Sequence, residues 1–303
     1  MLLLLKSLTM LLYLTLLLAD LLLWFILLRE LKERNNILRL VIMAFKALVS
    51  AIFIFLFFSI TLYNGEFADP ANAFRQIQMG AISILLLVTS SACILISVIL
   101  RLTSALIKGR HRGTGLANSI IFLLLTLLIA DGYFRQRLNV RTIREEVSVD
   151  GLDPALDGMK IALISDLHIS SWYGSYEKLD RAMLAISGEE PDLLVNTGDF
   201  ITFGWQEFGS SDTILRKARA AAGGFAVEGN HDDGTYYPEY DKEYGRVCRE
   251  MVKQKTEESG YTLLRDTAVI VRHRGADIAV AGVITRGHRL DMSYGNFEQV
   301  LAP

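Results

Sequence analysis

Four long apolar stretches near the N-terminus constrain this chain more than any other feature. A helix needs about 20 apolar residues to cross the hydrocarbon core of a bilayer. The stretches that meet this length are Leu8–Leu28, Leu40–Tyr63, Met79–Leu100 and Leu116–Phe134. We therefore expect an N-terminal transmembrane region of four helices, which covers residues 1–134.

Three of the predicted spans carry an ionisable residue. Asp131 lies near a helix end and can reach the interface, and Lys46 lies about two turns into its span, from where its ammonium can extend toward water. Asp20 lies deeper, and an ionisable residue at such depth is a candidate functional residue. The other reading is that Asp20 faces a neighbouring helix or titrates to its neutral form. We favour this second reading because no partner motif accompanies Asp20.

The charges of the connecting loops predict the topology. Basic residues gather in the first and third loops, at Arg29, Lys32, Arg34, Arg39, Arg101, Lys108, Arg110 and Arg112. The second loop holds only Arg75 against Glu66 and Asp69. Short cytoplasmic loops are rich in Lys and Arg, so both termini are predicted to lie outside. The arginines that oppose this orientation follow the fourth span, at Arg135, Arg137, Arg141 and Arg144.

The composition changes beyond the fourth span. Residues 145–303 have the mixed charge of a soluble domain, and the whole chain carries a formal net charge of -2. This balance argues against nucleic acid as a partner, because nucleic acid favours a basic face. Cys93 and Cys248 lie in unlike regions, so no disulfide framework is expected.

The soluble part is predicted to have an α/β core. Short apolar runs predict strands at 161–164, 193–195, 225–227, 268–271 and 278–283. Leu179, Ala182, Met183 and Ile186 recur at the spacing of one helix face, and further helices are predicted at 212–222 and 240–259. Strands that alternate with helices indicate a sheet whose ligands gather at the carboxyl ends of the strands.

Polar motifs follow three of these strands directly. They are Ser165-Asp166-Leu167-His168, Thr197-Gly198-Asp199 and Glu228-Gly229-Asn230-His231-Asp232. Successive motifs are separated by roughly the 30 residues of one βα unit, so we expect the three strand tips side by side. Glycines beside Asp199 and Asn230 permit a tight turn at each tip.

The donor atoms of these motifs indicate a metal site. Carboxylate oxygen, imidazole nitrogen and amide oxygen together suit Mn, Fe or Zn better than calcium. A carboxylate such as Asp199 can bridge two ions, and two such ions can hold a hydroxide and clamp a phosphoryl group for in-line attack.

The three motifs, in this order, resemble those of the calcineurin-like metallophosphoesterases. The flanking residues Asp157–Ile161, Pro191-Asp192 and Ala281–Val283 are similar to the bacterial membrane-associated branch, which includes YkuE- and YaeI-type phosphodiesterases. The resemblance covers about residues 145–303. It implies a layered αββα sandwich and a site that holds two divalent metal ions.

The resemblance also implies a role for each motif residue. Asp166 and His168 would bind the first metal, Asp199 would bridge the two metals, and Asn230 would bind the second. His231 would lie near the leaving group and help to stabilise or protonate it.

The chain departs from the family pattern toward its C-terminus. The family supplies further histidines there, ending in a Gly-His-x-His pair. Gly287-His288 lacks the second histidine of that pair, so we expect His288 in a loop near the site mouth. His273 is expected on a hairpin turn and His111 in a basic loop. Thr202 stands where family members often carry Asp or Asn.

These departures lead us to expect a domain that is incomplete at its C-terminus. A sheet that lacks its last strands would keep an open edge. We expect the sequence to be truncated rather than evolved to a minimal form, with weak metal binding as it stands.

The leading hypothesis is a membrane-anchored phosphodiesterase or pyrophosphatase. Its expected partners are the lipid bilayer and a phosphoester substrate, which anchoring suggests is lipid-linked. The expected location is the bacterial cell membrane, with the catalytic domain extracytoplasmic. The first alternative is a non-catalytic membrane scaffold that keeps a degenerate phosphoesterase domain. A second alternative, a transporter or sensor, would depend on Asp20.

Overall fold

The chain folds into two compact units. The computed structural model describes residues 2–32, 35–61, 66, 68–106, 114–284 and 300. One unit comprises Met1–Asn64 with Gln76–Asn139, and the other comprises Gly65–Arg75 with Val140–Pro303. The second unit therefore includes a short segment that comes from between two of the predicted spans.

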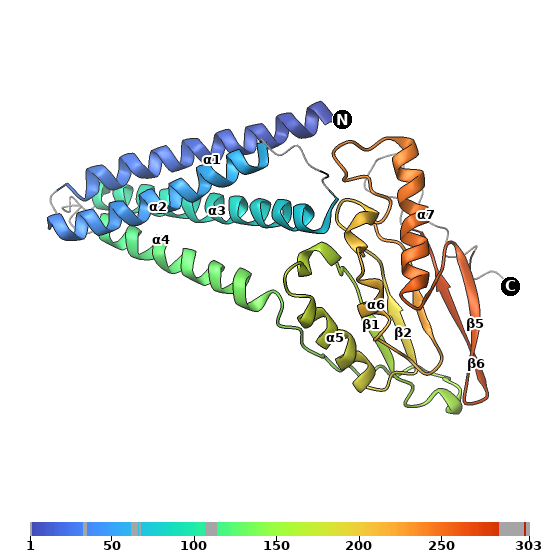
Figure 1. Cartoon of the computed structure of the whole chain (residues 1–303). Coiled ribbons are helices and arrows are strands. Elements are labelled where there is room, and N and C mark those ends of the chain that lie inside the picture. The colour runs from blue at the N-terminus through green and yellow to red at the C-terminus, as the bar shows by residue number, and fades with distance from the viewer. Residues whose placement is uncertain are drawn as a thin grey trace. The chain divides into compact units, whose positions relative to one another are not determined.

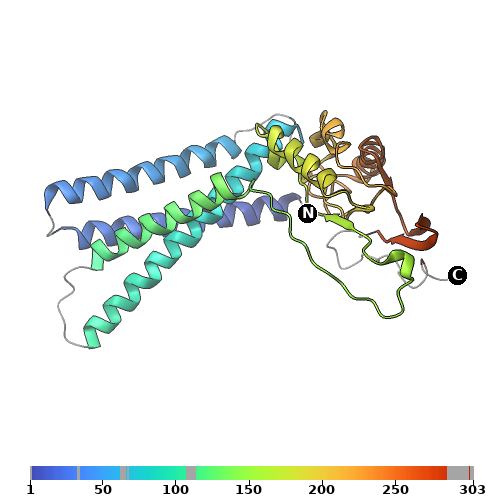
Figure 2. The ribbon, with the colours of Figure 1, turned by 90° about the horizontal axis from the view of Figure 1, so that it is seen from below.

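The N-terminal unit consists of long helices (Figures 1 and 2). They are α1 (Leu2–Glu30), α2 (Asn36–Thr61), α3 (Pro70–Leu106) and α4 (Thr114–Asp131), which continues into a π-helical turn at Gly132–Gln136. Each predicted span falls within or almost within one of these helices. Among the described residues, one stretch, Pro70–Ile96, is long and apolar enough to cross a membrane. Membrane crossing by the other three helices stays a prediction.

The helices α1 and α2 share a polar cluster beside the apolar core of the N-terminal unit. Lys46 is 1% exposed, and its ammonium donates to Asp20 and, at 2.9 Å, to Ser50 Oγ. Ser50 Oγ in turn donates to Asp20 Oδ2 at 2.9 Å and accepts from Trp24 Nε1 at 3.0 Å. These contacts decide the interpretations of Lys46 and Asp20. Lys46 does not extend toward water, because its ammonium is buried against Asp20, and Asp20 faces a neighbouring helix as favoured.

The second unit is built on a parallel sheet and a hairpin. The strands of the sheet, in spatial order, are β1 (Ile161–Ile164), β2 (Leu193–Asn196), β3 (Gly224–Ala226) and β4 (Tyr261–Leu263). The antiparallel hairpin consists of β5 (Thr267–His273) and β6 (Ala276–Gly282). The helices are α5 (Tyr176–Gly188), α6 (Asp212–Leu215) and α7 (Lys242–Glu258), with 3-10 turns η2 (Pro154–Leu156), η3 (Ile169–Trp172) and η4 (Trp205–Phe208).

Two elements differ from the sequence expectation. The strand β4 was not predicted, because its three residues follow directly on α7 and the left-handed Gly260 and are too few for a periodic signal. The helix α6 is shorter than the predicted 212–222. The N–H groups of Ala221 and Ala222 already donate to Pro191 and Asp192 carbonyls, so this segment runs alongside the start of β2.

The hairpin packs on one face of the sheet. Leu193, Phe225, Leu264 and Val271 form a buried cluster that joins β2, β3 and the hairpin. On the same face of the edge strand β1, Ile161 and Leu163 are 56% and 66% exposed. The described residues thus supply a helical layer, a parallel sheet and a β-hairpin. The second helical layer of the expected αββα sandwich is not among them.

Residues 66 and 68–75, here called the docking segment, pack onto the second unit. Gln206 Nε2 donates to Glu66 Oε1 at 2.9 Å, and the ring of Phe74 lies 5.8 Å from that of Tyr173. Ala68 is fully buried. The docking segment was expected to belong to the second loop, but it belongs to the α/β unit, and its residues 70–75 are the first turns of α3.

The polar cluster of the helices gives the first prediction. Lys46→Met leaves the Asp20 carboxylate without its cation, so we expect a loss of about 3 kcal/mol in the free energy of unfolding. Adding Asp20→Asn should restore most of that loss. Thermal unfolding of the full chain in detergent measures both.

The exposed pair Asp131–Arg135 serves as the control, with 2.9 Å between its charged atoms. Arg135→Gln should cost less than about 0.5 kcal/mol, because an exposed pair contributes little. Equal losses for Lys46→Met and Arg135→Gln would contradict a structural role for the buried pair.

Candidate metal centre

Three neighbouring parallel strands deliver the polar motifs to one edge of the sheet. The strands β1, β2 and β3 are hydrogen-bonded in that order, and each is followed by one motif. The first and second motifs stay paired beyond the strands, since the N–H groups of Asp166 and His168 donate to the carbonyls of Gly198 and Asp199 at 3.0 and 2.9 Å. The expected adjacency of the strand tips is therefore found.

The backbone is strained at the predicted ligands. Asp166, His168 and Asp199 have φ values of 52°, 40° and 56°, in the left-handed region. Half of the six non-glycine residues with positive φ in the described chain are thus predicted ligands. Such conformations cost about 1–3 kcal/mol each and persist where the surroundings impose them, which is typical of functional sites.

Two glycines let the second and third tips touch. Gly198 has a φ of 100°, and a Cβ on it would stand 2.2 Å from Gly229 N. A Cβ on Gly229 would stand 2.0 Å from Asp199 Oδ1. Gly198 therefore makes the expected tight turn, whereas Gly229 is required for close approach to the Asp199 carboxylate.

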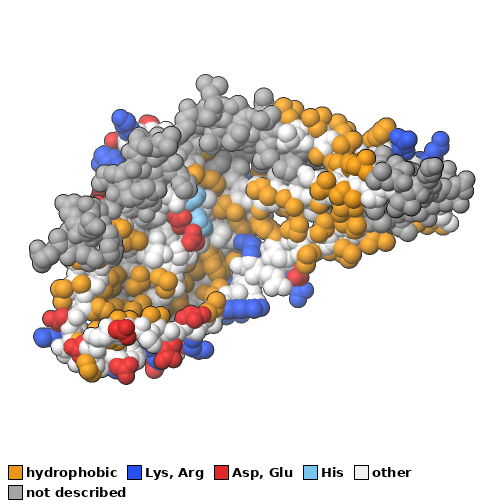
Figure 3. Space-filling view, turned by 180° about the vertical axis from the view of Figure 1, so that it is seen from behind, with side chains coloured by type: hydrophobic (Ala, Val, Ile, Leu, Met, Phe, Trp, Pro, Cys, Tyr) orange, Lys and Arg blue, Asp and Glu red, His pale blue; other side chains and the backbone are white. Residues whose placement is uncertain are grey.

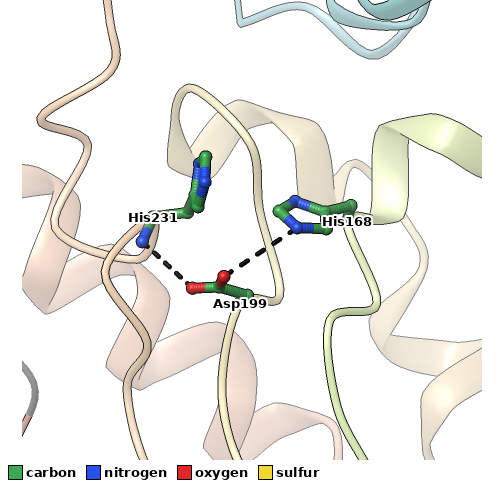
Figure 4. Close-up of side chains that lie close together, drawn as sticks. All are labelled: His168, Asp199 and His231. Carbon is green, nitrogen blue, oxygen red and sulfur yellow. Dashed lines mark hydrogen bonds and ion pairs between the residues drawn. The ribbon is translucent and has the colours of Figure 1, made fainter.

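The side chains of His168, Asp199 and His231 lie close together (Figure 4). Their ligand atoms all lie within 4.8 Å of one another, so these residues could hold a metal ion. His168 Nε2 lies 3.9 Å from Asp199 Oδ2 and 4.0 Å from Asp166 Oδ1. The backbone N–H of His231 donates to Asp199 Oδ1 at 3.0 Å. Figure 3 shows histidine and acidic side chains side by side at the surface.

Thr202 orients both imidazoles. His168 Nδ1 lies 3.1 Å from the Ile201 carbonyl and from Thr202 Oγ1, so Nδ1–H donates and Nε2 keeps its lone pair toward the carboxylates. His231 Nδ1 donates to the Thr202 carbonyl at 2.8 Å. Burial, and then the nearby His231, lower the pKa of His168 against the opposing effect of Asp199. A neutral imidazole with a free Nε2 is the form that binds a metal.

Asn230 presents its amide in a fixed direction. Its Nδ2 donates to the hydroxyl of Tyr236 at 3.0 Å, which leaves Oδ1 without a role in that bond. The ring of Tyr236 also stacks on His231, with 4.1 Å between the ring centroids. Tyr236 was missed by the sequence analysis because a single tyrosine in a loop carries no spacing signal.

The carboxylate of Asp232 holds the second and third tips together. It is fully buried and accepts four backbone N–H groups. Oδ2 accepts from Asp199 and Gly229 at 2.8 and 2.9 Å, and Oδ1 accepts from Phe200 and Ile201 at 2.9 and 3.2 Å. Burial raises the pKa of Asp232, and the hydrogen bond from Gly229 opposes this rise.

A second buried carboxylate holds the loop that carries Thr202. Glu207 is fully buried and accepts from the backbone N–H groups of Thr202, Phe203 and Gly204, and from the Ser170 hydroxyl. The loop therefore has a fixed conformation, and so do the two contacts of Thr202 with the imidazoles. This accounts for how threonine can serve at the position where Asp or Asn was expected.

Three other histidines were considered from the sequence. His273 is the last residue of β5, just before the turn at Arg274–Gly275, and it is buried rather than exposed on the turn. His288 and His111 lie outside the described residues.

The donor set and the comparisons with known proteins agree. Residues 159–295 match the family model of the calcineurin-like phosphoesterases. The C-terminal part of the chain is a calcineurin-like metallophosphoesterase domain. Its motif residues Asp166, His168, Asp199 and Asn230 carry the oxygen and nitrogen donors that divalent metals require. They could therefore hold the ions that this family uses.

Curated relatives of this chain include one that is named as a transmembrane protein. The uncharacterized metallophosphoesterase YkuE of Bacillus subtilis is 33% identical over 32% of this chain and 34% of its own length. A transmembrane protein with metallophosphoesterase domain from Danio rerio is 26% identical over 42% of this chain and 28% of its own length. The UDP-2,3-diacylglucosamine pyrophosphatase LpxG of Chlamydia muridarum is 39% identical over 27% of this chain and 25% of its own length.

The chain thus spans about a quarter to a third of the length of these relatives. No solved structure matches it significantly.

The Asp232 carboxylate gives the second prediction. In Asp232→Asn one oxygen becomes an NH₂ group that faces two N–H donors, so we expect a loss of about 3 kcal/mol in the free energy of unfolding. Urea unfolding of the full chain in detergent measures this loss.

Asp233→Asn is the matched control. Asp233 accepts only from the N–H and hydroxyl of Thr235, through Oδ1, and an asparagine keeps one such oxygen. We expect it to cost less than about 1 kcal/mol. A loss for Asp232→Asn as small as that of the control would show that the tips are held by other contacts.

Proposed function

We propose that this protein is a membrane-anchored, metal-dependent phosphoester hydrolase of the phosphodiesterase or pyrophosphatase type. The observation that carries the proposal is the convergence of His168, Asp199 and His231 at the ends of adjacent strands in a metallophosphoesterase domain. Two divalent ions, Mn, Fe or Zn, would supply a hydroxide and neutralise charge on the phosphoryl group.

The oxygen and nitrogen donors of the motif residues determine which ion each side chain would bind. Asp166 and His168 would hold the first ion, with His168 Nδ1–H fixed by the Ile201 carbonyl. Asp199 would bridge the ions, and Asn230 would hold the second through Oδ1. These roles account for the left-handed backbone conformation of three of the four residues, Asp166, His168 and Asp199.

His231 would serve the leaving group. Hydrolysis breaks the bond between phosphorus and the leaving oxygen, which must gain a proton. His231 Nδ1 donates to the Thr202 carbonyl, so Nε2 is the nitrogen that can carry a proton to that oxygen. The incoming oxygen stays on phosphorus. A phosphodiester then gives an alcohol and a phosphate monoester, and a pyrophosphate diester gives two phosphate monoesters.

A lipid-linked phosphoester is the proposed substrate class. The long apolar helices of the N-terminal unit would hold the site at a bilayer surface, and Pro70–Ile96 is long and apolar enough to cross it. One relative is a pyrophosphatase whose substrate name joins UDP to a diacylated sugar. This supports a pyrophosphate or phosphodiester that carries acyl chains.

The proposed location is a bacterial cell membrane with the hydrolase outside the cytoplasm. The basic residues of the first and third loops support this orientation. The docking segment comes from the second loop and packs in the α/β unit through Ala68 and Glu66, which supports the same side for both.

The bridging carboxylate gives the third prediction. Asp199→Asn removes the charge shared by the two ions, so we expect hydrolysis of bis-p-nitrophenyl phosphate with Mn²⁺ to fall roughly 100-fold or more. The assay uses the full chain in detergent, and Asp150→Asn, an exposed substitution, should leave the rate unchanged. Wild-type activity in Asp199→Asn would rule out the metal mechanism. A wild-type chain that binds Mn²⁺ and hydrolyses no phosphoester would instead favour the scaffold alternative.

The topology gives the fourth prediction. Single cysteines introduced as Glu66→Cys and Asp150→Cys should both react with a membrane-impermeant maleimide in intact cells, since Cys93 and Cys248 are buried. Reaction of both only after lysis would reverse the orientation. Reaction of one without the other would contradict the placement of the docking segment on the α/β unit.

A further inference from the structure

Tyr236 touches two of the predicted site residues at once. Its ring stacks on His231 with 4.1 Å between centroids and 16° between planes. Its hydroxyl accepts from Asn230 Nδ2 at 3.0 Å. A single side chain thus contacts the proposed ligand of the second metal and the proposed proton donor.

We propose that Tyr236 is a positioning residue, which directs the amide oxygen of Asn230 toward the metal and holds the imidazole of His231 in place. The proposal rests on the proposed function for the roles of Asn230 and His231. Tyr236 itself need not touch the metal or the substrate.

The contact with Asn230 selects one orientation of its amide. A primary amide can turn over and exchange Oδ1 with Nδ2, but only the oxygen can bind a cation. The tyrosine oxygen accepts from Nδ2, so the oxygen of the amide points to the other side. Groups that orient a metal ligand typically change metal affinity 10–100-fold when they are removed.

The contact with His231 fixes the plane of its ring. The imidazole is held at one edge by the Thr202 carbonyl, which accepts from Nδ1 at 2.8 Å. A single hydrogen bond leaves the ring free to tilt about that bond. The stacked ring of Tyr236 removes this freedom, and His168 packs edge-on with 4.9 Å between centroids.

The loop that carries Tyr236 is itself anchored. Gly234 has a φ of 72°, and a Cβ there would stand 2.8 Å from Cys248 Sγ in α7. Tyr237 stacks on Tyr244 of α7 with 4.3 Å between centroids. The loop is therefore fixed on α7 by its neighbours, and Tyr236 is left to face the site.

Two variants separate the two contacts. Tyr236→Phe keeps the stacked ring and removes the hydroxyl, whereas Tyr236→Leu removes both. Tyr237→Phe is the matched control, because it lies next in the loop and keeps its own stack on Tyr244. Each variant is made in the full chain. Mn²⁺ affinity is measured by calorimetry on metal-free protein, and kcat and KM are measured with bis-p-nitrophenyl phosphate.

We expect Tyr236→Phe to bind Mn²⁺ about 10-fold more weakly and to keep its kcat at saturating Mn²⁺. Tyr236→Leu should show the same loss of affinity and a kcat roughly 10-fold lower, with KM little changed. Tyr237→Phe should match the wild type in all three. The unfolding temperature of the metal-free variants should stay within about 3 °C of the wild type.

An unchanged or higher Mn²⁺ affinity in Tyr236→Phe would overturn the assignment of Tyr236. A higher affinity would mean that the hydroxyl donates to Asn230 Oδ1 and competes with the metal ion for that oxygen. An unchanged kcat in Tyr236→Leu would overturn the part that concerns His231. The calorimetry also separates this proposal from the proposed function. A wild type that binds Mn²⁺ without hydrolysing phosphoesters contradicts the function, while the affinity of Tyr236→Phe still decides the role of Tyr236 toward Asn230.

Discussion

The site depends on one buried carboxylate that binds only backbone. Asp232 accepts four N–H groups, three from Asp199, Phe200 and Ile201 after β2 and one from Gly229 after β3. A buried acceptor of this kind fixes the peptide planes around it, because each donor would be costly to leave unpaired. The left-handed turn at Asp199 can persist because its N–H is held in this way. Asp232 is therefore not itself a predicted ligand, but it fixes the backbone of the two strand tips that carry Asp199 and Asn230.

A similar relation holds around Glu207, which binds the backbone of the loop that carries Thr202. The two carboxylates together leave the imidazoles of His168 and His231 with fixed hydrogen-bond acceptors. The candidate metal centre is thus arranged by main-chain groups and buried acids. This allows a threonine where a longer polar side chain was expected, since the carbonyl of residue 202 does much of the orienting.

Much of this could be predicted from the sequence. Strand β1 and the carboxyl ends of β2 and β3 follow from short apolar runs that end in Asp-x-His, Gly-Asp and Gly-Asn-His-Asp. Contacts that cross between elements could not be predicted, because no local pattern marks them. The Asp20–Lys46 pair joins residues that each looked like an isolated charge in its own span. Tyr236 and the docking segment were missed for the same reason, whereas strand β4 was missed because its three residues are too few for a periodic signal.

The docking segment has a consequence for how the molecule can be divided. The α/β unit contains Ala68 and Glu66, which lie more than 70 positions before Val140, where the main part of the unit begins. A Cβ on Gly204 would stand 2.8 Å from the Cβ of Ala68, so the two backbones are packed closely. A fragment that begins after α4 lacks Ala68 and would expose Gly204 to water, in the loop that runs from Thr202 to Glu207. The α/β unit is therefore discontinuous in sequence, because one of its boundaries lies within α3 and another lies in the linker after α4.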